Sequence, residues 1–469
     1  MTDILSLDTP GLVGAYRNGT VSPREAMAAV LDAAERANEA LNAFVLVDRD
    51  GALATATASE QRWREGRPNG PLDGVPFTVK DNLLWTGHPI RRGSLTTGGA
   101  PATENAPATD RLIDAGAIPF AKTTLTEFGW KGLGDSPLHG ITRNPWDRTA
   151  TTGGSSAGAA AAAALALGPL HLGTDGAGSI RIPASFCGVF GMKPSFGRVP
   201  AYPPSPFAVV SHVGPITRSV TDAAIMLGII AAPDDRDMTA LVTPPQDYLA
   251  SLELGVQGLT IAWSPRLGYV DRLDPEVEAL TAAAARVFAE LGATIVEADP
   301  GFDDPIEILR TIWHVGAWSV LRTIPEARWG EVDPGFVAGA ELGRAVSGSD
   351  YVAAVNARGA LYTRTERFHA SCNLLLTPTL ATPAFAAGHN TPPDGSFGDD
   401  WLGWTPYSYP FNLTMQPAAT VPCGLTKAGL PVGLQIVGPM HRDGLVLRAA
   451  RAFERARPWP ILAGRTSEA

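Results

Sequence analysis

The sequence has few cysteines and none of the common metal or nucleotide motifs. Its three cysteines, Cys187, Cys372 and Cys423, are scattered along 469 residues. This pattern predicts neither a disulfide framework nor a zinc site, and it fits a reducing compartment. There is no H-E-x-x-H motif, and no glycine cluster is followed by G-K-[ST]. We therefore expect a cytoplasmic protein that works without a metal or another cofactor.

Long apolar runs and concentrations of positive charge are also missing. The longest uncharged apolar run, near residues 157–170, is rich in alanine and contains Pro169, so it does not predict a membrane span. We expect no signal peptide, because the first residues lack its basic and apolar regions. The formal net charge is −10 and the Lys and Arg residues are dispersed, which argues against a nucleic-acid partner. A hydrophobic content of 45% with 18% charged residues instead predicts a globular protein with a large core.

What the chain does have is a lysine at the end of a short apolar segment. Residues 76–80 read P-F-T-V-K and are followed by Asp81 and Asn82, a pattern typical of a buried strand that ends in a turn. Burial removes water from the ammonium group and lowers the pKa of a lysine, so Lys80 is a candidate base near neutral pH. A lone lysine more often extends its ammonium group into water. The neighbouring motifs therefore decide between the two interpretations.

A second segment, G-G-S-S-A-G at residues 153–158, precedes a stretch without charged or polar side chains that extends to Leu167. A helix that is apolar all round must be buried, and Ser155 or Ser156 suits its N-cap. The same letters fit G-x-S-x-G, the nucleophile elbow of α/β-hydrolases, which would make Ser156 the nucleophile and require a histidine. No later histidine stands in a distinctive context, which disfavours this alternative. The histidines concerned are His171, His212, His314, His369, His389 and His441.

The third segment, G-T-D-G-A-G-S-I-R-I-P at residues 173–183, places small residues before a serine. Small side chains leave the backbone N–H groups next to Ser179 open, and convergent N–H groups are what a tetrahedral oxyanion requires. Asp175 and Arg181 flank the loop, and we expect them to pair because an unpaired buried charge is costly. The segment therefore predicts a nucleophile beside an oxyanion hole. The residues expected to form that hole are Gly176, Ala177 and Gly178.

Together the three segments resemble the amidase signature family, whose members use a Ser–cis-Ser–Lys triad. The resemblance implies that Ser179 is the nucleophile, Ser155 the bridging serine and Lys80 the base. It also implies a cis peptide bond between Gly154 and Ser155. The two serines are 24 positions apart, which fits the family pattern. The supporting residues of the site are then Gly154, Ser156, Asp175 and Arg181.

The resemblance covers about residues 71–215 and 374–459. It implies an α/β fold, the amidase-signature fold, with a central mixed β-sheet covered by helices on both faces. Alternating strand and helix signals after Pro71 favour the same architecture. The chain departs from the family in two places. It has G-A-G before the nucleophile, where a bulkier residue and two glycines are frequent, and T-M-Q-P-A at 414–418, where T-G-x-P-A is frequent.

The layout predicts a single large domain with three parts. Residues 1–68 are expected to form an N-terminal helical segment. Residues 69–235 and 371–469 are expected to form the amidase core that carries the site. Residues 236–370 are expected to form a largely helical insert that lines the substrate pocket.

These features predict hydrolysis of an amide C–N bond through an acyl-enzyme on Ser179, with water as the second substrate. An apolar or aryl small-molecule amide is favoured, and carbamates (urethanes) and esters would pass through the same intermediate. Arg358 lies where it could meet a substrate carboxylate, although an exposed helix arginine is the favoured interpretation. The candidates for the substrate pocket are Trp130, Trp313, Trp318, Trp401, Tyr407 and Met415.

One alternative comes from a different functional class. The A subunit of a tRNA-dependent amidotransferase resembles the same family and acts with partner subunits. The central region of this chain lacks the tyrosine- and asparagine-rich stretch associated with that subunit, so we favour an amidase that acts alone. A homodimer is the one assembly we consider.

Overall fold

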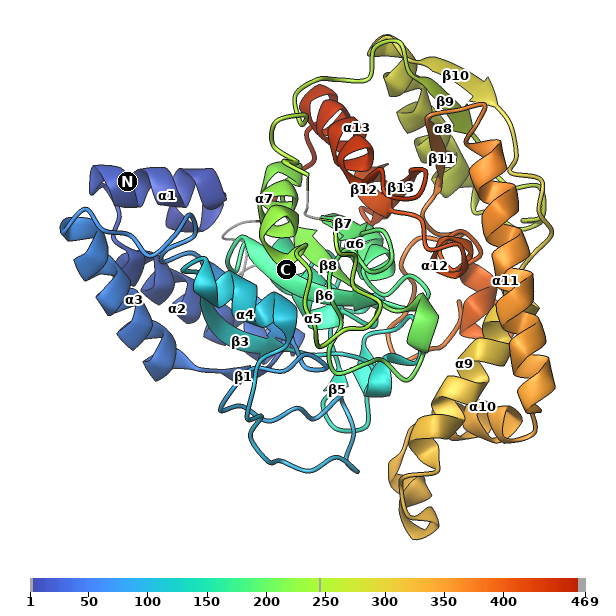
Figure 1. Cartoon of the computed structure of the whole chain (residues 1–469), viewed down its shortest axis with the longest axis horizontal. Coiled ribbons are helices and arrows are strands. Elements are labelled where there is room, and N and C mark those ends of the chain that lie inside the picture. The colour runs from blue at the N-terminus through green and yellow to red at the C-terminus, as the bar shows by residue number, and fades with distance from the viewer. Residues whose placement is uncertain (1–2, 244–245, 463–469) are drawn as a thin grey trace.

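A large mixed sheet forms the centre of the molecule (Figure 1). The computed structural model describes residues 3–243 and 246–462. Eleven strands form this sheet, and the short strands β4 (Asp135–Ser136) and β5 (Gly140–Ile141) form a separate pair. The eleven are β1 (Phe44–Val47), β2 (Pro76–Lys80), β3 (Ile118–Thr123), β6 (Leu170–Asp175), β7 (Phe190–Lys193), β8 (His212–Thr217), β9 (Thr260–Trp263), β10 (Thr294–Glu297), β11 (Leu374–Pro378), β12 (Ala418–Leu425) and β13 (Pro431–Val437).

The strand order is β1-β3-β2-β6-β8-β7-β12-β13-β11-β9-β10. Strand β2 is parallel to β3 and β6, and β9 is parallel to β10 and β11. The other neighbours are antiparallel. The mixed sheet that the sequence predicts is therefore confirmed.

Helices lie on both faces of the sheet and at its edges (Figure 1). They are α1 (Thr9–Asn18), α2 (Pro23–Leu41), α3 (Arg49–Arg64), α4 (Pro107–Asp114), α5 (Ala157–Ala164), α6 (Arg181–Cys187), α7 (Val220–Ile230), α8 (Pro275–Glu290), α9 (Ile306–Leu321), α10 (Pro334–Arg344), α11 (Gly348–Phe368), α12 (Pro410–Leu413) and α13 (Asp443–Ala456). Short 3₁₀ helices are η1 (Ile4–Ser6), η2 (Glu127–Gly129), η3 (Ala208–Val210), η4 (Glu326–Glu331) and η5 (Trp401–Trp404). None of the helices within 3–243 and 246–462 combines the length and apolar character needed to span a bilayer.

Alternation along β2 separates the apolar core from the polar site. Phe77 and Val79 join the largest apolar cluster, which also contains side chains of α4, α7, α8 and α13. Lys80 follows Val79 and therefore points to the opposite face, where α5 packs on β2, β6 and β8. Helix α5 carries no side chain larger than alanine, so its backbone approaches its neighbours closely. A Cβ at Gly158 would lie only 2.0 Å from the Ala43 carbonyl oxygen.

Two segments expected to be helical also contribute strands. The N-terminal segment contains β1, whose Leu46 pairs with Lys122 of β3 in antiparallel register. Residues 236–370 contain β9 and β10, which extend the sheet beyond β11. Helices α9, α10 and α11 pack together at one end of the molecule (Figure 1). The N-terminal helical segment therefore contains one strand that was not expected, because the four-residue run F-V-L-V is too short to stand out between two helix patterns.

Candidate active site

Lys80 ends β2 with its side chain fully buried among hydroxyl groups. Its Nζ lies 2.8 Å from the hydroxyl oxygen of each of Ser155, Ser156 and Thr174. Burial lowers the pKa of Lys80 to about 7, and the negative charge of Asp175 only partly opposes this shift. Near neutral pH a large fraction of the Lys80 amine is therefore uncharged and able to accept a proton.

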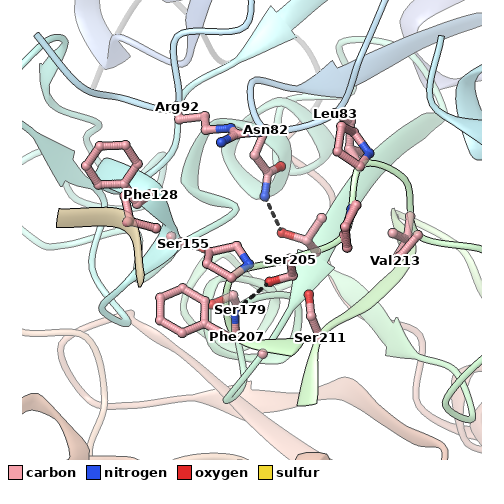
Figure 2. Close-up of a pocket in the computed structure, with 18 of the residues that line it drawn as sticks. Asn82, Leu83, Arg92, Phe128, Ser155, Ser179, Ser205, Phe207, Ser211 and Val213 are labelled. Atoms are coloured by element: carbon pink, nitrogen blue, oxygen red, sulfur yellow. Dashed lines mark hydrogen bonds between the residues drawn. The ribbon is translucent and has the colours of Figure 1, made fainter. Parts of the chain in front are cut away.

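The partners of these hydroxyl groups indicate which proton Lys80 can take. Ser156 Oγ donates to the Thr174 carbonyl oxygen at 3.2 Å, so only its lone pairs face the amine. Thr174 Oγ1 also accepts a hydrogen bond from Asn82 Nδ2 at 3.0 Å (Figure 2). A neutral amine has two N–H groups and one lone pair. Because Ser156 accepts one N–H group, the lone pair of the neutral amine is left to the hydroxyl groups of Ser155 and Thr174, both 2.8 Å away.

The segment that carries Ser155 is closely packed. The peptide bond between Gly154 and Ser155 is cis, as the sequence resemblance implies. A Cβ at Gly154 would lie 1.9 Å from the Leu133 carbonyl oxygen, so only glycine fits there. Ser156 occupies the N-cap of α5, but its hydroxyl makes no capping hydrogen bond and faces Lys80 instead. Of the two serines expected to suit the N-cap, Ser156 takes that position.

Ser179 lies between β6 and α6 in a loop that the Asp175 carboxylate shapes. Oδ1 accepts the Gly178 N–H at 2.7 Å and Oδ2 accepts the Ile180 N–H at 3.2 Å. Arg181 Nε lies 2.9 Å from Asp175 Oδ2, and both side chains are fully buried, which confirms the expected pair. Burial alone would raise the pKa of Asp175, but the Arg181 guanidinium holds it below its usual range. The carboxylate therefore stays ionised and keeps the loop in one shape.

Residues near the C-terminus add hydrogen bonds to the Asp175–Arg181 ion pair, and together these contacts form the anchor of Arg181. Arg181 Nη1 donates to the Ser408 carbonyl oxygen at 2.9 Å and to Gln435 Oε1 at 2.7 Å. Asn412 Nδ2, on α12, donates to Asp175 Oδ1 at 2.9 Å. Each of these acceptors and donors is buried. The two sequence blocks that resemble the family thus meet at one buried ion pair.

The backbone N–H groups of the loop fall into two sets. The Gly178 N–H donates to Asp175 and is not available to a ligand. The expectation that Gly178 contributes to the oxyanion hole is therefore wrong. Those of Gly176, Ala177 and Ser179 have no acceptor among the residues that the structure describes. These three N–H groups are therefore the candidate oxyanion donors.

Ser155 and Ser179 line the same cavity (Figure 2). The Ser156 N–H donates to the Ser179 carbonyl oxygen at 3.1 Å, which ties the two serine segments together. Within the described chain, no hydrogen bond joins the hydroxyl groups of Ser155 and Ser179. Gly129 leaves space beside Ser155, because a Cβ there would lie 3.3 Å from its Oγ. The Lys80–Ser155 link of the expected triad is thus formed, and the two serine hydroxyls face a common space.

The cavity has a largely apolar wall. Phe207 stacks on Trp313 with ring centroids 3.8 Å apart and an interplanar angle of 11°. Trp313 also closes over the loop that carries Ser179, since a Cβ at Gly176 would lie 3.0 Å from its ring. A flat apolar ligand would find matching surface there. The other lining residues are Asn82, Leu83, Arg92, Phe128, Gly129, Thr174, 201–206, Ser211, Val213 and Val320.

Of the predicted pocket residues, Trp313 lines this cavity. Trp130 and Trp401 line a second cavity, on the side of α9 and α10, which shares Trp313 with the first. The other three, Trp318, Tyr407 and Met415, are not among the described residues that line either cavity. Tyr407 is fully buried and donates to the Pro265 carbonyl oxygen, Trp318 packs edge-on against Trp329, and the Met415 carbonyl oxygen accepts the Phe196 N–H.

Arg358 also differs from its expected state. It is half-buried rather than exposed, and its Nη1 donates to the Val209 carbonyl oxygen at 3.0 Å. It is not among the residues that line the cavity of Ser179. Its contact supports the chain that leads into β8 and gives no sign of a carboxylate site.

No histidine is among the described residues that line this cavity. His171 is fully buried, its Nδ1 lies 2.9 Å from Thr78 Oγ1, and burial lowers its pKa to about 3. Ser156, the nucleophile of the elbow alternative, has its hydroxyl on Lys80 and Thr174. The arrangement of an α/β-hydrolase is therefore not present around Ser156.

Sequence reasoning missed the wall formed by residues 201–207. This run, A-Y-P-P-S-P-F, precedes β8, and β8 pairs with β6 so that His212 lies opposite Asp175. The chain entering β8 must therefore pass beside the end of β6, where the Ser179 loop begins. Its prolines and aromatic residues were a visible signal, but their place depends on a strand pairing that the sequence does not display.

Comparison with known proteins agrees with this geometry. The sequence matches the Amidase family over residues 25–447. An acylamidase from Rhodococcus erythropolis is 38% identical over 97% of this chain and 96% of its own. The A subunit of glutamyl-tRNA(Gln) amidotransferase from Chloroflexus aurantiacus is 32% identical over 98% of both chains. The crystal structure of a bacterial aryl acylamidase of the amidase signature (AS) enzymes family has a TM-score of 0.89 and 30% identity, and covers 97% of this chain and 96% of that chain. With nearly its full length matched in sequence and in fold, the chain belongs to the amidase signature family and is an amide-hydrolysing enzyme.

Proposed function

We propose that this enzyme cleaves the C–N bond of a small apolar or aryl amide through an acyl-enzyme on Ser179. The observation that carries the proposal is the buried amine of Lys80, which has a pKa of about 7 and lies 2.8 Å from Ser155 Oγ. Ser155 and Ser179 line one cavity, so a proton can pass between them when substrate closes the site. This combination supplies a base and a nucleophile without a histidine.

Acylation begins with the neutral amine. Lys80 takes the proton of Ser155 Oγ, which takes the proton of Ser179 Oγ as that oxygen attacks the substrate carbonyl carbon. The carbonyl oxygen becomes an oxyanion within reach of the free N–H groups of Gly176, Ala177 and Ser179. Each donor of this kind typically contributes about 3 kcal/mol to the transition state.

The same groups then work in the opposite direction. Protonated Lys80 returns its proton through Ser155 to the leaving nitrogen, because an amide anion is a poor leaving group. The C–N bond breaks, the amine departs, and the acyl group remains as an ester on Ser179. Water attacks this ester with Lys80 and Ser155 again serving as the base. The products are a carboxylic acid and an amine.

The apolar walls support the proposed substrate class. Phe207 and Trp313 present stacked rings, and Leu83, Phe128 and Val213 add further apolar surface. Aryl or alkyl groups gain free energy by leaving water for such a surface. Carbamates and esters form the same kind of tetrahedral intermediate. We therefore propose that the enzyme also cleaves them, at rates that differ from the rate for an amide.

The relatives also include amidotransferase A subunits, at 32–35% identity against 38% for the acylamidase. The higher identity and the apolar cavity favour an amidase that acts without partner subunits. Turnover of 4-nitroacetanilide by the purified chain distinguishes the two functions. A chain that needs its partner subunits would release no 4-nitroaniline alone, and that result would favour the amidotransferase.

A mass-spectrometric experiment tests the acyl-enzyme. We expect brief incubation with 4-nitrophenyl butanoate and acid quenching to add one butanoyl group to the peptide that contains Ser179. Ser179→Ala should lose both this adduct and at least about 10⁴-fold in anilide turnover. Ser185→Ala, on the buried face of α6, is the matched control and should retain both. Anilide turnover by Ser179→Ala within tenfold of the wild type would refute the proposed nucleophile.

A further inference from the structure

We propose that Arg92 forms an anion subsite in the active-site cavity and selects amides that carry a carboxylate. This inference rests on the proposed function and specifies its substrate class further: an apolar or aryl amide with a carboxylate at one end. Three properties of the site support it, namely the charge of the cavity, the neighbours of Arg92 and its position relative to Ser155.

Arg92 is the sole charged side chain among the described residues that line the cavity. The other lining side chains are apolar, hydroxyl or amide groups, and the wall opposite is built from prolines and aromatic rings. A positive charge in such surroundings is poorly shielded by water, so it attracts an anion strongly. The cavity therefore favours a substrate with one negative group.

The second property is the set of neighbours around Arg92. Among the described residues, its guanidinium makes neither an ion pair nor a hydrogen bond. The nearest carboxylate, that of Asp81, is already occupied: Oδ1 lies 2.9 Å from Lys122 Nζ and Oδ2 accepts the Arg91 N–H at 3.2 Å. The buried Lys122 and the half-buried Arg92 thus have a single nearby carboxylate between them, that of Asp81.

Burial of Arg92 adds to this imbalance. The partial loss of water lowers the pKa of its guanidinium, and the charge of Asp81 opposes the shift only in part. A partly dehydrated guanidinium without a counter-ion is costly in free energy unless a ligand supplies one. Its planar fork of N–H groups matches the two oxygens of a carboxylate, which favours a carboxylate over a neutral carbonyl group.

The position of Arg92 is fixed relative to the reacting serines. Its carbonyl oxygen accepts the Phe128 N–H at 2.8 Å, and the next residue, Gly129, borders Ser155 Oγ. Figure 2 shows Arg92 and Asn82 on one side of the cavity and Phe207 on the other, beside Ser179. A substrate held between these sides would place its carboxylate at Arg92, its scissile bond at Ser179 and its apolar part on Phe207.

Two matched substrate pairs test the subsite. Glutaryl-4-nitroanilide and pentanoyl-4-nitroanilide differ by a carboxylate at the end of the acyl chain. The N-butanoyl amides of 4-aminobenzoate and 4-methylaniline differ by a carboxylate on the amine side. We expect the wild-type enzyme to prefer the carboxylate member of at least one pair in kcat/KM, and the responsive pair shows which product carries the charge.

Substitution assigns the preference to Arg92. Arg92→Met should lower the kcat/KM ratio of that pair by roughly 10- to 100-fold, the range expected for a hydrogen bond to a charged group. Arg92→Lys should retain part of the preference, because it keeps the charge and loses the fork. Arg91→Met, which changes the neighbouring arginine that does not line the cavity, should leave the ratio unchanged. A wild type that prefers the neutral member of both pairs, or an Arg92→Met enzyme with the wild-type ratio, would overturn the inference.

A binding measurement separates this inference from the proposed function. Calorimetric titration of the Ser179→Ala protein with 4-nitrobenzoate requires no turnover. We expect binding that weakens roughly 10- to 100-fold when Arg92→Met is added. If the wild type hydrolyses no amide but this difference is seen, the amidase proposal fails while the subsite stands. Equal affinity of the two proteins for 4-nitrobenzoate would overturn the subsite.

Discussion

Lys80 and Lys122 lie on the adjacent parallel strands β2 and β3, and both are buried, yet their surroundings differ. Burial lowers the pKa of both amines. Lys122 Nζ lies 2.9 Å from Asp81 Oδ1, whereas Lys80 Nζ contacts hydroxyl groups and a carbonyl oxygen. The comparison shows that the partner, more than the burial, separates a candidate base from a cation that stabilises the fold.

The largest expected effect is on the Lys80 side of this comparison. Lys80→Met should lower kcat for 4-nitroacetanilide by at least about 10⁴-fold, because Lys80 is the basic group that contacts Ser155 Oγ among the described residues. The protein should stay folded, since a buried amine without a counter-ion is replaced by an apolar chain of similar length. Steady-state kinetics measure the loss of kcat, and thermal melting checks that the variant is folded. A loss of less than tenfold in kcat would remove the distinction between the two lysines.

The matching change at Lys122 should affect stability instead. Lys122→Met removes the cation that contacts the buried Asp81 carboxylate, and losing one partner of a buried ion pair typically costs about 3–5 kcal/mol of the free energy of unfolding. Chemical denaturation measures this loss. Asp81→Asn combined with Lys122→Met is the control, because removing both charges should restore part of the stability. An unchanged free energy of unfolding for Lys122→Met would show that the ion pair has no structural role.

The pH dependence gives the smallest and most graded effect. Only the neutral Lys80 amine accepts a proton, so kcat/KM should fall as pH decreases through about 7. The expected slope is about tenfold per pH unit well below this pKa, as for the loss of a single basic group. Initial rates between pH 5 and 9 measure it. The double variant Asp81→Asn with Lys122→Met serves as the control and should keep the same acid limb; a limb that moves with it would assign the titration to the Asp81 region.

Local patterns were sufficient to predict the candidate triad. Lys80, Ser155 and Ser179 each stand within a continuous motif of small or apolar residues, and each motif folds into the strand end, helix start or loop that its composition favours. The mixed sheet followed from the alternation of such patterns. These features depend on neighbours in the sequence, so one chain is enough to find them.

The parts that sequence reasoning missed depend on contacts between distant segments. The direction of the Asp175 carboxylate decides whether the Gly178 N–H is free, and that direction follows from Asn412 and Arg181. Tyr407 looked like a pocket residue but fills the core, because aromatic side chains suit both places. Arg92 attracted no notice in the sequence, since the pairing of Asp81 with Lys122, which leaves Arg92 unpaired among the described residues, is visible only in the structure.

The anchor of Arg181 has a consequence for the order in which the enzyme becomes competent. Its guanidinium donates to acceptors on Ser408 and Gln435, more than 200 residues downstream of the loop that carries Ser179. During synthesis on the ribosome, Ser179 emerges long before these acceptors exist. A partly made chain therefore carries Ser179 in an unfinished loop, and we expect hydrolysis to begin only when the last strands have been added.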